Sequence, residues 1–264
     1  MTHPWFAGSG TPRVLAHRGL VTAAAAAHGI AENSFAAVAE AHAAGAVYVE
    51  SDCHLTVDGA VVLFHDATLQ RVTGDPRPLA AVSLAELDAL MADRGGLITL
   101  EQALDAFPTV RFNIDVKADE AAEPAGRIVA PHADRVLLTS FSDRRRGRAL
   151  TAARDAGGVP ATSAGTATIG RVLAALTLHS RALVRRALSG VDALQVPERH
   201  RGVRIVTPRL LDAAHRAGVE VHVWTVDEEA DMRRLFALGV DGVVTDRADL
   251  ALRVAAGQAP GTDR

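Results

Sequence analysis

The sequence has a single cysteine, Cys53, so no disulfide can form within the chain. Aromatic side chains make up only 4 % of the 264 residues, so the core must be built from valine, leucine, isoleucine and alanine. No uncharged apolar stretch reaches the ~18 residues that a transmembrane helix needs. The formal net charge of −3 supplies no general basic field, and we therefore expect no nucleic-acid partner.

The first 13 residues also lack the apolar run of a signal peptide, and we expect a cytoplasmic protein. Hydrophobic residues make up 48 % of the chain and charged residues 22 %, which is typical of a folded globular protein. No low-complexity linker or block of charge divides the sequence. We therefore predict one domain over residues 1–264, while the sequence specifies no oligomeric state.

Apolar segments of strand length alternate with helical patterns along the whole chain. The expected strands are 13–17, 47–55, 61–65, 110–116, 135–141, 158–163, 193–196, 219–226 and 239–244. Helices are expected between most of them, including 34–44, 100–106, 208–217 and 228–238. Such alternation predicts parallel βα units.

The first strand does not lead into the glycine-rich turn that an open nucleotide-binding sheet would use. About eight strands in about 250 residues favour a closed (β/α)₈ TIM barrel instead. Residues 67–96 are the least regular part of the pattern, and we interpret them as a small insertion after an early strand.

Polar residues follow several of these strands at their C-terminal ends. Alternation along a strand places Glu50 and Asp52 on one face, and it places Asp115 and Lys117 together on the face of their own strand. In a barrel these ends converge on one mouth, where active sites lie. Three carboxylates, from Glu50, Asp52 and Asp115, predict an oxygen-rich site for one divalent cation, Mg²⁺ or Ca²⁺.

The remaining polar side chains at these ends suit an anionic substrate. Arg18 and Lys117 can bind phosphate oxygens, the former through its planar guanidinium. His17 and His65 can serve as a general acid and base pair. Cations, imidazoles and a metal together are typical of phosphodiester cleavage.

In their order and spacing these residues resemble the glycerophosphodiester phosphodiesterase family over nearly the whole chain. The matching motifs are His17-Arg18-Gly19, Glu32-Asn33, Glu50-Ser51-Asp52, His65-Asp66, Asn113-Ile114-Asp115-Val116-Lys117, Ser140-Phe141, Val223-Trp224-Thr225-Val226 and the segment 239–246, which ends in Thr245-Asp246. One departure is Asp115, where the family usually has glutamate, so this side chain reaches less far.

The resemblance implies a TIM barrel that hydrolyses glycerophosphodiesters to glycerol 3-phosphate and an alcohol. By this similarity Glu50, Asp52 and Asp115 would hold the metal, and His17 and His65 would be the acid and base. Arg18 and Lys117 would bind the phosphate. Glu32 would assist near the metal and the glycerol, and Trp224 would form a wall of the glycerol pocket. The implied mechanism passes through a cyclic phosphate.

Each assignment has a simpler structural alternative. Asp115 could be only the ion-pair partner of Lys117, and Trp224 could be a core residue. Glu32 precedes Asn33-Ser34, which also fits a helix cap. His54 lies on the face of Glu50, and we expect it to be a solvated residue at the rim.

Two other functions remain compatible with this sequence. The barrel could act as a lysophospholipase D or sphingomyelinase D-like phosphodiesterase on lipids, or as a non-catalytic phosphate-binding barrel. Residues 171–188 combine leucines and valines with four arginines, Arg171, Arg181, Arg185 and Arg186. We expect an outer barrel helix there, and a weak contact of its basic face with a membrane surface is a further hypothesis.

Overall fold

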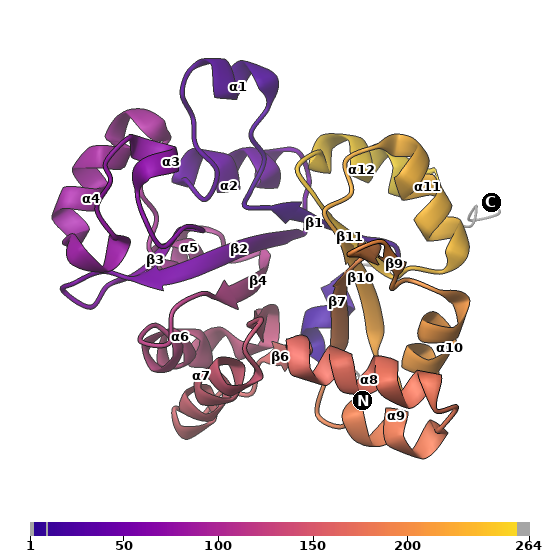
Figure 1. Ribbon diagram of the computed structural model, residues 1–264. Coiled ribbons are helices and arrows are strands. Elements are labelled where there is room, and N and C mark those ends of the chain that lie inside the picture. Colours follow the sequence, from indigo (N-terminus) through magenta and orange to yellow (C-terminus); the bar gives the residue numbers. More distant parts are fainter. Residues whose placement is uncertain (1–2, 9, 258–264) are drawn as a thin grey trace.

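The computed structural model describes residues 3–8 and 10–257, and within them eight parallel strands form a nearly closed barrel with helices outside (Figure 1). Around the barrel the strand order is β6-β5-β4-β2-β1-β11-β10-β7. Their bounds are β1 (Arg13–His17), β2 (Tyr48–Leu55), β4 (Arg111–Val116), β5 (Val136–Thr139), β6 (Ala161–Thr162), β7 (Ala193–Pro197), β10 (Glu220–Trp224) and β11 (Gly242–Thr245). The predicted TIM barrel is confirmed.

The barrel closes between β6 and β7, where the pairing is weakest. β6 has only two residues, and a single parallel bridge between Ser163 and Ala193 joins it to β7. Two backbone hydrogen bonds support this seam, from Asp192 N to Thr162 O at 2.9 Å and from Ala164 N to Ala193 O at 3.0 Å.

The helices lie on the outer face of the barrel, and several begin at a residue whose side chain caps the first turn. Ser34 caps α2 by accepting a hydrogen bond from Ala37 N, and Thr207 caps α10 ahead of Pro208. The helix bounds are α1 (Ala23–Ala27), α2 (Phe35–Ala43), α3 (Gln70–Thr73), α4 (Leu84–Met91), α5 (Leu100–Ala106), α6 (Ala122–Val129), α7 (Asp143–Asp155), α8 (Thr166–Thr177), α9 (Arg181–Ala187), α10 (Pro208–Arg216), α11 (Glu229–Leu238) and α12 (Ala248–Ala256).

The expected strand 61–65 is not a parallel strand of the barrel. β3 (Val61–Leu63) pairs antiparallel with the far end of β2, where Leu55 faces Val61. The reversal occurs at Gly59, whose φ of 86° is in the left-handed region that favours glycine. His65 therefore reaches the mouth of the barrel on a returning strand.

The segment 67–96 folds over the β2–β3 hairpin and has a small core of its own. It contains α3, α4 and two 3₁₀ helices, η2 (Leu79–Ala81) and η3 (Ala92–Arg94). Leu69, Leu87 and Met91 are fully buried there against Val62 of β3. This packing fixes the loop that carries His65.

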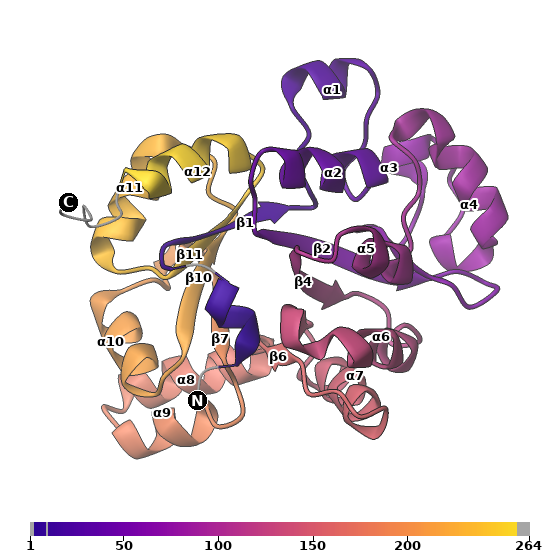
Figure 2. The same ribbon diagram turned by 180° about the vertical axis from the view of Figure 1, so that it is seen from behind.

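The N-terminal 3₁₀ helix η1 (Pro4–Gly8) covers the end of the barrel opposite the mouth (Figure 2). Trp5 is fully buried, and its indole N–H donates to Phe112 O at 3.0 Å. Its ring lies 4.7 Å from that of Tyr48, beside Leu15 in the barrel interior. Trp5, one of the two tryptophans in the chain, therefore fills the apolar end of the barrel opposite the mouth.

The expected single helix over 171–188 is wrong, because the segment belongs to two helices, α8 and α9. His179 adopts a φ of 57° between them, and the Ser180 side chain caps the second helix. The described residues contain no helix long and apolar enough to cross a membrane.

Candidate active site

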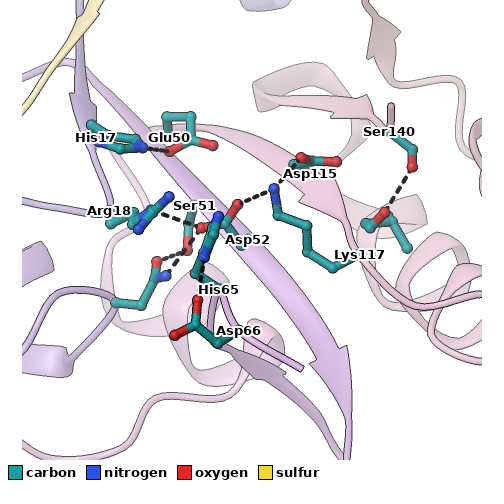
Figure 3. Close-up of polar contacts among 12 residues, drawn as sticks. His17, Arg18, Glu50, Ser51, Asp52, His65, Asp66, Asp115, Lys117 and Ser140 are labelled. Atoms are coloured by element: carbon teal, nitrogen blue, oxygen red, sulfur yellow. Dashed lines mark hydrogen bonds and ion pairs between the residues drawn. The ribbon is translucent and has the colours of Figure 1, made fainter. Parts of the chain in front are cut away.

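A cavity of about 610 Å³ opens at the C-terminal ends of the barrel strands. One side of it is polar and contains every predicted site residue except Glu32 and Trp224 (Figure 3). The predicted residues that line this side are His17, Arg18, Glu50, Asp52, His65, Asp115 and Lys117. Trp224 lines the cavity as well. Side chains from segments as far apart in the sequence as His17 and Trp224 thus meet in one space.

The turn after β1 explains why His17, Arg18 and Gly19 occur together. Arg18 has a φ of 58° and Gly19 a φ of 91°, so the chain turns sharply as soon as the strand ends. A Cβ added to Gly19 would lie 2.5 Å from the carbonyl carbon of Ala37 in α2. The turn therefore requires glycine, and it aims the side chains of His17 and Arg18 at the cavity.

His17 stands between two carboxylates. Its Nδ1 lies 2.7 Å from Asp246 Oδ1, and its Nε2 lies 3.9 Å from Glu50 Oε2. Burial on its own would lower the pKa of His17, but the hydrogen bond to Asp246 and the charge of Glu50 outweigh it and raise the pKa. The same contact lowers the pKa of Asp246.

His65 has a comparable partner on the other side. Its Nδ1 lies 2.6 Å from Asp66 Oδ1, while Arg71 of α3 donates to Asp66 Oδ2 at 2.6 Å. The hydrogen bond with Arg71 holds the pKa of Asp66 down, at about 2. Both histidines therefore have Nδ1 engaged by a carboxylate, which leaves Nε2 for the cavity.

His54 is not the solvated rim residue that the sequence predicts. It is only 8 % exposed, because β3 pairs alongside it, and its Nε2 lies 3.0 Å from His65 O. Burial lowers its pKa, so this imidazole is suited to holding the His65 backbone in its neutral form.

Asp52 lies at the centre of a charge network, between Arg18 and Lys117 (Figure 3). Lys117 Nζ is 2.9 Å from Asp52 Oδ1 and 2.6 Å from Asp115 Oδ2. On the other side Arg18 Nε is 3.1 Å from Asp52 Oδ2. Although burial opposes ionisation, these cations lower the pKa of Asp52.

Asn33 fixes this carboxylate from behind. Its Nδ2 donates to Asp52 Oδ2 at 3.2 Å, and its Oδ1 accepts from Ser51 Oγ at 2.6 Å. Ser51 points away from the cavity and Asp52 points into it. The Asn33 side-chain amide therefore hydrogen-bonds residues on both faces of β2. Asn33 therefore supports the site, while the helix cap next to it is Ser34.

Glu50 and Asp115 each keep a buried oxygen without a hydrogen-bond partner, Oε2 and Oδ1 respectively. Burial and then the charge of Asp52 raise the pKa of Glu50 to about 8. Buried, unpaired carboxylate oxygens are costly, so these two atoms favour a cation beside them. Oxygen donors of this kind suit Mg²⁺ or Ca²⁺.

Asp52 and Asp115 are, however, already paired with cations of the protein itself. Across the residues that the structure describes, no group of three or more His, Cys, Asp or Glu side chains is set to hold a metal ion. Both oxygens of Asp52 are engaged by Lys117, Arg18 and Asn33. The buried carboxylate oxygens left without a hydrogen bond are therefore Glu50 Oε2 and Asp115 Oδ1, with Asp52 adjacent to Asp115 across the β2–β4 pairing.

Glu32 lies beside the cavity rather than in its wall. Its Oε1 accepts from Arg18 at 2.7 Å and from Arg71 at 2.6 Å. Arg71 also binds Asp66. A continuous chain of ion pairs thus connects His65, through Asp66, Arg71 and Glu32, to Arg18.

The opposite side of the cavity is apolar. Trp224 contributes to it and meets Phe141 edge-on, with ring centroids 5.8 Å apart. Trp224 is therefore a cavity residue, and its other contacts are with the core inside the barrel. The main apolar lining residues are Phe141, Ile169, Leu173, Val196, Ile205 and Trp224.

The sequence did not assign roles to Asp66, Asp246, Arg71 or Asn33, which contact the predicted site residues. Asp66, Asp246 and Asn33 occur inside the motifs noted above, so a signal was present for them. Arg71 lies in the irregular segment 67–96 and had none.

Residues 17–250 match the model of the glycerophosphoryl diester phosphodiesterase family. The chain belongs to this family. It is a glycerophosphodiester phosphodiesterase, as the motifs predicted, and membership in a family of enzymes speaks against a barrel that only binds phosphate.

Individual members of this phosphodiesterase family are similar over most of their length. "Probable glycerophosphodiester phosphodiesterase 2" of Mycobacterium tuberculosis is 38 % identical over 240 residues, covering 89 % of this chain and 88 % of that one. Lysophospholipase D GDPD1 of Rattus norvegicus is 24 % identical over 252 residues, covering 81 % and 79 %. A solved phosphodiesterase of Oleispira antarctica, in complex with the product sn-glycerol-3-phosphate, superposes with a TM-score of 0.70 at 22 % identity, covering 92 % and 96 %.

Proposed function

We propose that this enzyme hydrolyses glycerophosphodiesters to sn-glycerol 3-phosphate and an alcohol, with His17 and His65 as the acid and base. The observation that supports this most is the matched pair of imidazoles. Each has Nδ1 engaged by a carboxylate, and both line the same cavity. Arg18 and Lys117 supply positive charge for the phosphate between them.

In the proposed reaction the glycerol 2-hydroxyl attacks phosphorus and the bond to the alcohol oxygen breaks. One histidine takes the hydroxyl proton, while the other donates a proton to the departing alcohol. A cyclic phosphate forms, and water then opens it with the two roles reversed. Holding the hydroxyl beside phosphorus supplies a large effective molarity, because attack occurs within one bound molecule.

Glu50, Asp52 and Asp115 would hold one divalent cation, Mg²⁺ or Ca²⁺. The unpaired oxygens of Glu50 and Asp115 support this assignment. When bound, the ion would neutralise negative charge on the phosphoryl oxygens. Lys117 would then keep Asp52 ionised through its 2.9 Å contact, and Arg18 would remain near the phosphate. Glu32 would act through Arg18, whose guanidinium it orients.

A lipid substrate is a second candidate, and the apolar side of the cavity favours it. Glycerol and phosphate are small and polar, whereas Ile169, Leu173 and Ile205 offer them nothing to bind. An acyl chain would bury its apolar surface there. A relative named as a lysophospholipase D matches four fifths of this chain, which is consistent with such a substrate.

Turnover of glycerophosphocholine and lysophosphatidylcholine, with EDTA and with Mg²⁺ or Ca²⁺ restored, tests these proposals together. We expect glycerol 3-phosphate from glycerophosphocholine, loss of turnover in EDTA and its recovery with one of the two ions. Full turnover in EDTA would contradict the metal assignment. If lysophosphatidylcholine is cleaved but glycerophosphocholine is not hydrolysed under any condition, the enzyme acts on lipids and the first proposal is wrong.

A further inference from the structure

A short hairpin of two strands stands at the mouth of the barrel. β8 (Arg199–His200) and β9 (Val203–Arg204) pair antiparallel, and residues 199–204 are all exposed. The hairpin follows the C-terminal end of β7, so it lies at the same end as the cavity (Figure 1). His200 and Ile205 line the cavity, which makes the hairpin part of its wall.

The hairpin is strongly cationic. Arg199, Arg201 and Arg204 project from six consecutive exposed residues. Arg199 and Arg201 form no ion pair within the described residues, and Arg204 is 4.0 Å from Glu198. Glu198 itself is bound by Arg234 at 2.7 Å, so it neutralises little of the hairpin's charge.

Exposed apolar side chains accompany this charge. Val203 of the hairpin is 64 % exposed, and Phe141, on the apolar side of the cavity, is 56 % exposed. Basic residues together with exposed apolar side chains are typical of protein surfaces that lie on anionic membranes. The headgroups of an anionic lipid surface suit the arginines, and its acyl region suits the apolar side chains.

We propose that the β8–β9 hairpin docks the mouth of the enzyme on an anionic lipid surface. The arginines contact the headgroups, and Val203 enters the upper acyl region. Docking then places the apolar wall formed by Ile205, Phe141 and Leu173 next to the bilayer. The surface proposed from the sequence, around Arg181, Arg185 and Arg186, is on α9, which connects α8 to the start of β7 and lines no part of the cavity.

Co-sedimentation with vesicles tests the proposal. The parent is expected to bind phosphatidylcholine vesicles that contain phosphatidylglycerol, to bind pure phosphatidylcholine weakly, and to dissociate as salt is raised. Replacing Arg199, Arg201 and Arg204 together with glutamine is expected to weaken vesicle partitioning roughly 100-fold, because each arginine near an anionic surface contributes on the order of a factor of five. Val203→Asp, a second and independent variant, should also weaken binding.

The matched control replaces Arg181, Arg185 and Arg186 of α9 with glutamine, which removes the same charge elsewhere. This control should bind vesicles like the parent. The proposal is overturned if the parent does not bind anionic vesicles or if the hairpin variants bind them as the parent does. It is also overturned if the α9 control loses as much binding as the triple variant of the hairpin. Glycerophosphocholine turnover in solution, measured on every variant, is a separate readout. Absence of this turnover in the parent would refute the proposed function. The docking proposal would then be decided by the vesicle-binding results alone.

Discussion

In the candidate active site, each of the two imidazoles has an aspartate at Nδ1. Asp246 contacts His17 Nδ1 at 2.7 Å, and Asp66 contacts His65 Nδ1 at 2.6 Å. Asp246 is itself held in place, because Asp227 Oδ1 accepts from its backbone N–H at 2.8 Å. Each carboxylate fixes a tautomer and stabilises the imidazolium, which is what a residue that alternates between acid and base requires.

Asp246→Asn is expected to reduce kcat by roughly 100-fold or more, the usual contribution of a positioned acid or base. It should also lower the pKa of His17, because the contact that raises this pKa loses its charge. A higher pKa keeps His17 protonated to higher pH. The limb of the pH–rate profile that His17 sets should therefore move to lower pH in the variant.

Asp249→Asn is the matched control for this substitution. Asp249 is a nearby surface carboxylate paired with Arg247 and Arg253, and it has no contact with the cavity. Its variant should keep the parental kcat and pH profile. An Asp246→Asn enzyme with the parental profile would show that Asp246 does not act through His17.

For individual residues, the sequence indicated which side chains line the cavity better than it indicated which residues they contact. His17, Glu50, Asp52, Asp115 and Lys117 were predictable because strand alternation places them on the inner face at one end of the barrel. Contacts between loops follow no such rule. His17 and Asp246 are 229 residues apart, and only the closed barrel, which sets β1 beside β11, brings them together.

Among the elements, the β2–β3 hairpin departs most from the regular pattern. The short apolar run at residues 60–64 is compatible with either a parallel or an antiparallel strand, so its direction was not predictable. The break between α8 and α9 was equally hidden, since no proline or glycine marks it in the sequence. Helices with clear caps, such as α5 and α10, were predicted within one residue of their observed ends.

α8 contributes Ile169 and Leu173 to the apolar wall of the cavity, and Leu173→Gln tests whether that wall selects the substrate. The polar amide would be left without partners against an acyl chain, which costs roughly 1–3 kcal/mol. We expect kcat/KM for lysophosphatidylcholine, relative to that for glycerophosphocholine, to fall about 10-fold or more.

Leu178→Gln serves as the control, because Leu178 is the C-cap residue of the same helix, is 69 % exposed and does not line the cavity. Its kcat/KM ratio should equal that of the parent. If Leu173→Gln also leaves the ratio unchanged, α8 does not bind the acyl chain.

Across the whole molecule, a line of buried polar groups passes from the cavity to the barrel floor. Asn113 donates to Gln195 at 3.4 Å, and Gln195 Nε2 lies 3.3 Å from Nδ1 of the fully buried His222. The line ends at Glu220, which binds His222 at 3.0 Å and Arg13 at 2.8 Å. The floor of the barrel, which is the end opposite the cavity, is therefore stabilised by the Glu220 ion pairs as well as by the apolar packing of η1.

Glu220→Gln tests this contribution through the pH dependence of stability. Burial opposes ionisation, but hydrogen bonds from Arg13 and His222 bring the pKa of Glu220 from 4.5 to about 2. A lowered pKa stabilises the fold above pH 4.5, and the stabilisation is lost as pH falls toward 2. The parent should exceed the variant by on the order of 1–3 kcal/mol in free energy of unfolding at neutral pH, allowing for partial exposure.

The difference in free energy of unfolding should shrink to near zero in urea titrations at the acid end of this range. Glu229→Gln removes an exposed carboxylate paired with Arg233 on α11 and should change stability by less than about 0.5 kcal/mol. A parent-to-Glu220→Gln difference that stays constant from neutral pH to pH 2 would contradict this account of the floor.

The kcat for glycerophosphocholine in His17→Ala, His65→Ala and the double variant tests the central claim most directly. Two histidines that act as one acid–base pair should each cost roughly 100-fold or more in kcat when removed, and the double variant should be little worse than either single variant. Parental turnover in either single variant, with the fold intact by circular dichroism, would contradict the claim.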